Sequence, residues 1–155
     1  MVAHEFPAPI LRDPAVADGY MKHYVPLPEP VAEALGGSPR VAGTLGGVPF
    51  RRTVQRRAGG ERCLRFGAGW LRDAGLDVGA VVPVRVGPDP EPDRVDVPAE
   101  LDAALSLDPG ARAAWRALPP GRRRTLAYGV ARAKRPETRE RRARALAESV
   151  RSGAR

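Results

Sequence analysis

The stretch RVAGTLGGVPFRRTV, residues 40–54, decides the fold of the first half of the chain. Two short apolar runs flank Gly46-Gly47, and a pair of glycines permits the positive φ angles of a two-residue hairpin turn. After the turn, alternation places Val48 and Phe50 on one face of a second strand. The stretch therefore predicts a β-hairpin.

Two further stretches have the composition of strands, ERCLRF at 61–66 and AVVPVRV at 80–86. Pro83 within the latter favours an edge strand or a bulge, because proline cannot donate a ladder hydrogen bond. A weak repeat accompanies these strands with an offset of 39 residues: Val25, Val31, Leu35 and Gly36 recur as Leu64, Trp70, Ala74 and Gly75. Strand, short helical turn, glycine and strand, repeated once, predict a barrel with pseudo-twofold symmetry.

From residue 98 the period of the apolar residues changes from two to 3.6. We expect a short helix after Pro98. Asp108 is a favourable N-cap, and Pro109 suits the first position of the helix that follows. Pro120 and Pro136 begin the last two expected helices. The second part of the chain is thus predicted to be helical.

The positive charge lies mainly in the C-terminal part. Residues 1–108 carry 12 basic and 15 acidic side chains, whereas residues 109–155 carry 14 basic and three acidic ones. Of the 26 basic residues, 24 are arginine, in a chain also rich in alanine, glycine and proline. Such a composition indicates a codon bias, so the number of arginines alone is weak evidence for nucleic-acid binding.

The composition also excludes several classes of protein. One cysteine, Cys63, cannot form an internal disulfide or a thiolate zinc site. No stretch approaches the ~20 apolar residues that span a bilayer, and the N-terminus lacks the pattern of a signal peptide. We therefore expect a cytoplasmic protein without a membrane span or a structural metal.

Four stretches occur in an order that resembles a known family: RVAGTLGGVPFRRTV, LRDAGLDVGAVVPVRV, VDVPAELDAAL and LPPGRRRTLAYGVARAKRPETRERR. They are similar to the YdeI/OmpD-associated family, also labelled bacteriocin-protection proteins, over roughly residues 20–153. The resemblance implies an α+β fold, in which a small double-split β-barrel of unknown function precedes a helical segment. It also implies a role in binding or stress protection.

The chain departs from the family pattern at two places. Gly79-Ala80 stands where relatives tend to have Gly-Asp, which removes a turn hydrogen bond. Tyr128-Gly129 stands where the second C-terminal helix of relatives usually carries tryptophan, which loosens packing. Because the family has no agreed activity, neither departure bears on function.

The sequence gives little support for catalysis. His4 and His23 have no acidic or nucleophilic residue at a catalytic spacing, and we expect His23 to lie on a strand surface. Cys63 has the position of a small core residue. The pairs of glycines are better explained as turns than as phosphate-binding loops. We therefore expect a protein that is not an enzyme and that has no cofactor.

The segment GRRRT, residues 121–125, places Arg122, Arg123 and Arg124 in the first turn of a helix, where the helix dipole disfavours cations. Some counter-charge should compensate. Carboxylates of the net-negative part could supply it, such as those of Glu100, Asp102 and Asp108, so that the arginines clasp two domains together. Alternatively, the arginines and the free backbone N–H groups bind an external anion.

The last helix carries its own acidic partners in part. Glu137 with Arg141, and Glu140 with Arg144, have the favoured order of i, i+4 ion pairs. No obvious partner remains for four other basic residues: Lys134, Arg135, Arg139 and Arg142. The surplus predicts a basic face, yet the stretch lacks a series of aromatic residues for stacking bases and a sequence-reading motif.

These observations predict two domains, a split β-barrel at 1–97 and a basic helical segment of three to four short helices at 98–155. The candidate residues for binding an anion or a partner are Arg122, Arg123, Arg124, Lys134, Arg135, Arg139 and Arg142. The partner itself is not identified: it is either an acidic protein or a nucleic acid bound with low sequence specificity. The sequence leaves open which partner binds and whether the protein is a monomer or a homodimer.

Overall fold

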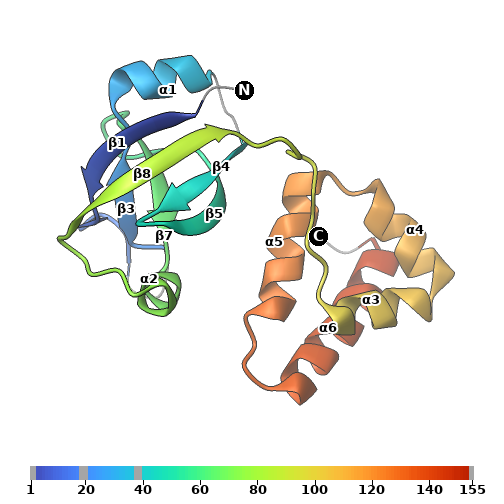
Figure 1. Cartoon of the computed structure of the whole chain (residues 1–155). Helices are drawn as coiled ribbons and strands as arrows, with labels where there is room; N and C mark the ends of the chain where they lie inside the picture. The colour runs from blue at the N-terminus through green and yellow to red at the C-terminus, as the bar shows by residue number, and fades with distance from the viewer. Residues whose placement is uncertain (1–2, 18–20, 37–39, 154–155) are drawn as a thin grey trace. The chain divides into compact units, whose positions relative to one another are not determined.

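The computed structural model of the chain describes residues 3–17, 21–36 and 40–153. These residues form two compact units, with the division between Pro92 and Asp93. We call the first the β unit and the second the helical unit (Figure 1). Together they give an α+β protein with a helical C-terminal part.

The β unit contains two antiparallel sheets of four strands each. The first sheet has the order β1-β8-β4-β5, with the bounds β1 His4–Pro9, β8 Val81–Pro88, β4 Arg40–Leu45 and β5 Val48–Thr53. The second has the order β2-β3-β7-β6, with the bounds β2 Leu11–Arg12, β3 His23–Pro26, β7 Arg62–Phe66 and β6 Gln55–Arg56. Among the described residues the strands do not close into one barrel. The double-split barrel expected from the resemblance is therefore not established.

The two sheets share a twofold arrangement. The half β1-β2-β3-α1-β4 and the half β5-β6-β7-α2-β8 have the same order of elements, and exchanging them reproduces both strand orders. The helices α1, Glu29–Leu35, and α2, Ala68–Ala74, begin 39 residues apart. They lie at opposite ends of the sheets (Figure 1). The weak repeat in the sequence thus corresponds to two halves of one unit.

Each sheet is centred on a pair of residues that are themselves 39 positions apart. Val25 pairs with Leu64 in the middle of the second sheet, and Leu45 pairs with Val84 in the middle of the first. All four side chains are buried. The twofold axis therefore passes through the apolar core, and each half supplies strands to both sheets.

The predicted hairpin joins β4 to β5. Gly46 and Gly47 have φ angles of 55° and 83°, the backbone conformation that favours glycine in such a turn. A different constraint acts at Gly43 in β4. A Cβ atom built there would lie 1.8 Å from the carbonyl oxygen of Arg85 in β8. The close approach of these two strands therefore requires a residue without a side chain.

Two expectations for the β unit were wrong. Pro83 lies in β8, which has neighbours on both sides, rather than on an edge strand. The ladder with β4 ends at the pair Leu45–Val84, so the missing N–H of Pro83 breaks no pairing with β4. His23 is buried at 6% exposure rather than on a strand surface, because β3 is an interior strand of the second sheet.

Four helices form the helical unit: α3 Ala99–Ser106, α4 Pro109–Ala117, α5 Pro120–Ala131 and α6 Pro136–Arg151. Three of them begin at a proline, as predicted. The Asp108 carboxylate caps α4 by accepting a hydrogen bond from the Ala111 N–H at 3.1 Å, which confirms the predicted N-cap. None of the described helices is long and apolar enough to cross a membrane.

The core of the helical unit is apolar and rich in alanine. Its buried residues are Leu101, Leu105, Ala111, Trp115, Ala127, Val130, Ala143, Ala147 and Val150. The small side chains allow helices to approach closely, while Trp115 fills the larger space. The chain has two tryptophans, Trp70 in the β unit and Trp115 in the helical unit. Their fluorescence can therefore follow the unfolding of each unit.

Candidate functional site

The seven basic residues singled out from the sequence do not form one group. Arg122, Arg123 and Arg124 lie in the first turn of α5, whereas the other four lie between the end of α5 and the second turn of α6. The helix α5 has 12 residues. Its length of about 18 Å separates the two groups.

The arginines at the start of α5 are engaged with backbone carbonyl groups. Arg123 donates from Nε to the carbonyl oxygen of Leu118 at 3.0 Å, and Arg124 donates from Nη1 to that of Arg94 at 3.5 Å. Leu118 follows the last residue of α4, so Arg123 binds a carbonyl at the negative end of the preceding helix. This contact offsets part of the unfavourable position of Arg123 in the first turn of α5.

The carboxylates expected to balance these arginines have other partners. Glu100 pairs with Arg139 at 3.2 Å, Asp102 with Arg112 at 3.0 Å, and Asp108 with Arg151 at 3.4 Å. All six residues belong to the helical unit. A clasp between two domains through Glu100, Asp102 and Asp108 is therefore wrong, since these acids join helices within one unit.

Arg139 fixes the connection between α5 and α6. Besides its ion pair with Glu100, its Nη1 donates to the carbonyl oxygens of Ala133 and Lys134 at 3.0 and 3.1 Å. The pKa of Glu100 is lowered, first by a hydrogen bond from the backbone N–H of Glu100 itself and next by the guanidinium of Arg139. Arg142 adds a bond from Nη1 to the carbonyl oxygen of Gly129 at 2.9 Å. Both arginines thus bind carbonyl groups in or just after the last turn of α5, which have no partner within the helix.

Arg139→Gln is expected to lower the thermal midpoint of the helical unit clearly, whereas Arg141→Gln leaves it nearly unchanged. Arg139 loses an ion pair and two bonds to carbonyl groups, and Arg141 is an exposed residue of the same helix. Thermal unfolding followed by the fluorescence of Trp115, in a Trp70→Phe background, measures the difference. Equal midpoints for the two variants would show that these bonds contribute nothing.

The i, i+4 pairs expected along α6 are absent among its described residues. Neither Glu137 with Arg141 nor Glu140 with Arg144 forms an ion pair in the structure, and all four side chains are exposed. Exposed pairs of this kind gain little energy and lose side-chain entropy, which explains why they do not form. The basic residues of α6 therefore have fewer local counter-charges than the sequence indicated.

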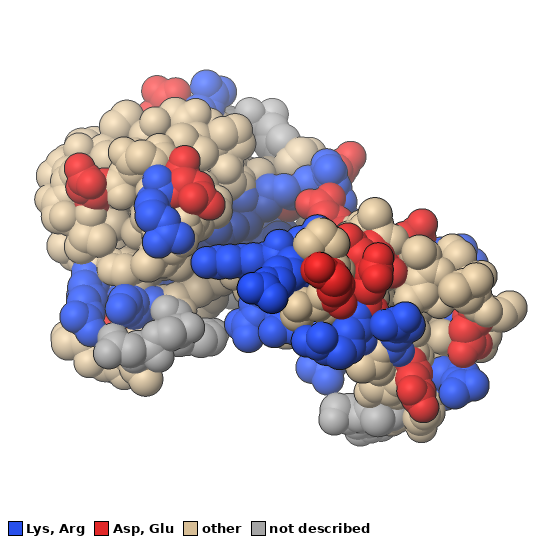
Figure 2. Space-filling view, turned by 90° about the horizontal axis from the view of Figure 1, so that it is seen from below, with Lys and Arg blue, Asp and Glu red and all other residues tan. Residues whose placement is uncertain are grey.

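Four exposed cations remain around the connection from α5 to α6: Arg132, Lys134, Arg135 and Arg142. We call them the basic corner. Within the described part of the chain, none of the four makes an ion pair with a carboxylate. Arg132 was not among the predicted residues, although it lies only two positions before Lys134. Figure 2 shows Lys and Arg side chains lying next to one another over part of the helical unit.

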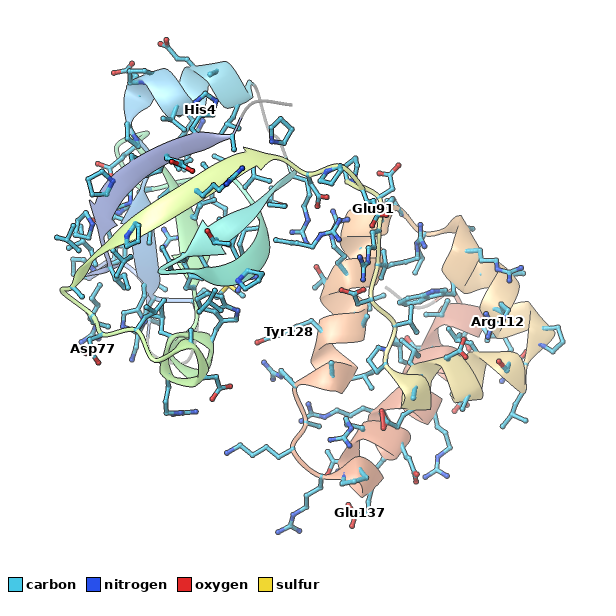
Figure 3. All side chains as sticks on the ribbon, in the orientation of Figure 1. His4, Asp77, Glu91, Arg112, Tyr128 and Glu137 are labelled. Atoms are coloured by element: carbon cyan, nitrogen blue, oxygen red, sulfur yellow. The ribbon has the colours of Figure 1, made fainter. Side chains whose placement is uncertain are left out.

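An exposed aromatic side chain accompanies the basic corner. Tyr128 is 57% exposed and projects from α5 away from the other helices of the helical unit (Figure 3). Arg132, the C-cap residue of α5, follows one helical turn later in a helical backbone conformation, so it lies on the same side as Tyr128. Glu137 and Glu140 of α6 are the acidic residues nearest in sequence to the corner, each two positions from one of its cations. The corner thus combines positive charge with one ring that is open to solvent.

The β unit contains two buried carboxylates that the sequence analysis missed. Asp13 accepts hydrogen bonds from Arg57 at 3.3 Å and from Arg65 at 2.9 Å, and Asp89 accepts from Nε of Arg51 at 3.0 Å. Both carboxylates are nearly inaccessible to solvent, at 2% and 7% exposure. The bond from Arg57, followed by that from Arg65, lowers the pKa of Asp13 to about 2. These contacts join strands and loops of the β unit and are structural.

The described residues offer little for nucleophilic or metal chemistry. Cys63 is buried in β7, and burial raises the pKa of its thiol, which opposes formation of the reactive thiolate. In residues 3–17, 21–36 and 40–153, no group of three His, Cys, Asp or Glu side chains is placed to hold a metal ion.

Two family models together cover most of the chain. The model of DUF1905, a domain of unknown function, matches residues 6–86, more than half of the chain. The model described as bacteriocin-protection, YdeI or OmpD-associated matches residues 94–153. The chain belongs to the YdeI/OmpD-associated family. Its DUF1905 domain coincides with the β unit and the family segment with the helical unit. No curated protein matches the chain.

Proposed function

We propose that this chain is a binding protein without enzymatic activity, and that its basic corner contacts an anionic partner. One observation carries the proposal: the corner holds four exposed cations without a carboxylate partner among the described residues, while Arg112, Arg139 and Arg151 are paired within the same unit. The protective role in the family's description would then follow from binding rather than from catalysis.

The rigidity of the corner supports this proposal. Arg139 and Arg142 tie the connection between the helices to carbonyl groups of α5 and its following residues. The backbone carrying Lys134 and Arg135 is therefore held in place before a partner arrives. A surface ordered in advance loses less entropy on binding, so each contact contributes more to affinity.

The start of α6 adds positive charge to the basic corner. Lys134 and Arg135 directly precede α6, whose N-terminus adds a partial positive charge. Phosphate and carboxylate groups are both attracted by such a concentration of positive charge. Because the cations are exposed, the attraction weakens as salt is added.

Tyr128 favours a second, more specific candidate, binding of single-stranded nucleic acid. A base stacked on an exposed ring contributes about 1–3 kcal/mol irrespective of its identity. Arg132 on the same face would contact the adjacent phosphate. With one exposed ring rather than a series, this surface would bind nucleic acid with low sequence specificity.

We also propose that the β unit is a double-split barrel. The twofold order of its strands supports it, since each half contributes to both sheets. The strands β1 and β2 are separated only by Ile10, and β5 and β6 only by Val54, so the chain passes from one sheet directly into the other. Such a unit would act as a platform that carries the basic helices.

The Arg135→Glu variant is expected to weaken binding of a short, labelled single-stranded oligonucleotide, whereas Arg116→Glu is not. Both substitutions change the net charge equally, but Arg116 lies near the end of α4, which precedes the opposite end of α5. Fluorescence anisotropy over a series of salt concentrations measures the affinity. Four phosphate contacts predict a slope of about 3 in log Kd against log salt, and removing one lowers it by about 0.7.

The same titration distinguishes the partners. Tyr128→Ala should weaken binding of the oligonucleotide and leave binding of a labelled polyglutamate peptide unchanged if bases stack on the ring. An equal loss for both substitutions, Arg135→Glu and Arg116→Glu, would show that net charge rather than the corner attracts the partner. Absence of binding to either polymer at low salt would remove the proposal.

A further inference from the structure

The two sheets of the β unit have edge strands, and an edge strand presents a row of backbone N–H and C=O groups on the side without a neighbouring strand. A further strand, from a partner or from a second copy, can add to a sheet through such a row. Among the described strands, the edges of the first sheet are β1 and β5 (Figure 1), and those of the second are β2 and β6. With two residues each, β2 and β6 are too short to hold an added strand. The edges that matter are therefore β1 and β5.

The pairing of β1 with β8 shows which of its backbone groups point outward. The N–H of Ile10, which follows β1 directly, donates to the carbonyl oxygen of Ala80 at 3.0 Å. The backbone groups of Ile10 thus point towards the side of β8. Because this direction alternates along an antiparallel strand, the groups of Glu5, Pro7 and Pro9 point away from β8, along the open edge.

Proline occupies two of these three outward positions in β1. In the row of Glu5, Pro7 and Pro9, only Glu5 has a backbone N–H. The ring of each proline stands where the hydrogen would be, so it meets the carbonyl oxygen of an incoming strand. Phe6 and Ala8, which face β8, keep their N–H groups for the ladder. The edge of β1 thus offers acceptors but lacks most of the donors that an added strand needs.

The opposite edge, β5, is obstructed in a related way. It begins directly after the two-residue turn, so Val48 forms the hydrogen-bonded pair with Leu45 and the next residue, Pro49, points outward. Arg51 points outward as well, and its carbonyl oxygen accepts a hydrogen bond from Nη1 of Arg52 at 2.9 Å. A proline at one outward position and a guanidinium at the next therefore hinder pairing along β5.

We propose that neither sheet of the β unit accepts an additional strand, because each edge is either too short or lacks free backbone groups for pairing. Neither a second copy of the chain nor an extended peptide then binds this unit through its edges. A partner must contact side chains instead, such as those of the basic corner. The proposal does not depend on whether the corner binds an anion, since it concerns only the backbone of the sheets.

Restoring the missing N–H groups tests the proposal. The double variant Pro7→Thr/Pro9→Thr regains all three outward donors of β1, and threonine favours strands without adding a large apolar side chain. Sedimentation velocity of the whole chain is measured over a range of concentrations. The double variant is expected to self-associate at least about tenfold more tightly than the wild type, as several additional hydrogen bonds predict. Hydrogen exchange locates the contact, because the amides at positions 5, 7 and 9 should become protected as the concentration rises.

Pro83→Thr is the matched control. Pro83 pairs with Pro7 in the register of β1 and β8, and both residues are exposed. The carbonyl oxygen of Pro83 accepts from the N–H of Gly46 at 2.9 Å, so its backbone groups point towards β4 and not along an edge. This control should sediment like the wild type.

If the double variant does not fold, Pro7→Thr alone decides, because it places a second donor next to that of Glu5 in the row. A folded variant that sediments like the wild type at every concentration overturns the proposal. So does a Pro83→Thr control that associates as strongly as the variant, because loss of a surface proline would then explain the effect. Association of the wild type with protection of the Glu5 amide would also overturn it.

Discussion

Replacing Gly43 with alanine is expected to cost the β unit about 3 kcal/mol or more of unfolding free energy. The added Cβ would lie 1.8 Å from the Arg85 carbonyl oxygen and 2.9 Å from the Cα of Val86. Both atoms belong to the backbone of β8, so no side chain can rotate away to make room. The strands β4 and β8 must separate, although their ladder joins the two halves of the unit.

Urea unfolding followed by the fluorescence of Trp70, in a Trp115→Phe background, measures this effect. Gly67→Ala is the matched control. Gly67 has a φ of −80° and no atom within 4 Å of a built Cβ, so alanine fits there. A Gly43→Ala protein as stable as the Gly67→Ala protein would mean that β4 and β8 do not approach each other as the structure shows.

The second large effect is expected for Asp13→Asn, which should lower the thermal midpoint of the β unit by roughly 5–10 °C at neutral pH. Asp13 and Arg65 are 2% and 7% exposed, and their side chains are joined at 2.9 Å. Neutralising the carboxylate leaves the buried guanidinium of Arg65 without its counter-charge. Removing one partner of a buried pair is far more costly than replacing both.

The difference between Asp13→Asn and the wild type should depend on pH. The pKa of Asp13 is about 2 in the folded protein, lowered first by Arg57, against about 3.9 for an unfolded aspartate. The stabilisation from the charged carboxylate is therefore complete above pH of about 4 and is lost as the pH falls towards about 2. The two proteins should become similar in stability over that window.

Urea unfolding at a series of pH values, again followed by Trp70, tests the dependence. Asp73→Asn is the control, because Asp73 is an exposed residue of α2 without an ion pair in the described structure. It should differ little from the wild type at any pH. A stability difference for Asp13→Asn that stays constant from neutral pH to acid would contradict the link to the charge of this carboxylate.

Local signals in the sequence predicted much of the fold. The pair Gly46-Gly47 indicated the hairpin, and Asp108, Pro120 and Pro136 indicated where helices begin, because turn and cap preferences depend on neighbouring residues. The strand β1 was missed. Two prolines within His4–Pro9 argue against a strand, yet β1 is an edge strand, where missing N–H groups are tolerated.

The candidate site was predicted only in part, because the partners of arginine are not visible in sequence. Arg139 and Arg142 were expected to bind an anion or a partner, and both bind backbone carbonyl groups in or just after α5. Arg139 also pairs with Glu100, whereas Arg142 stays exposed in the basic corner. The contacts of Asp13 with Arg57 and Arg65 span 44 and 52 residues, which no local pattern reveals. Lys134 and Arg135 remain exposed, as expected.

Each residue pair on the twofold axis of the β unit takes one residue from each half, so neither half can complete the two sheets alone. A peptide containing a single repeat would possess one member of the Val25–Leu64 pair and one of the Leu45–Val84 pair. It could complete its sheets only by associating with another molecule of itself. Tandem linkage turns that bimolecular association into a folding step within one molecule, which no longer depends on protein concentration. The β unit is in this sense a dimer of two repeats fused into one chain.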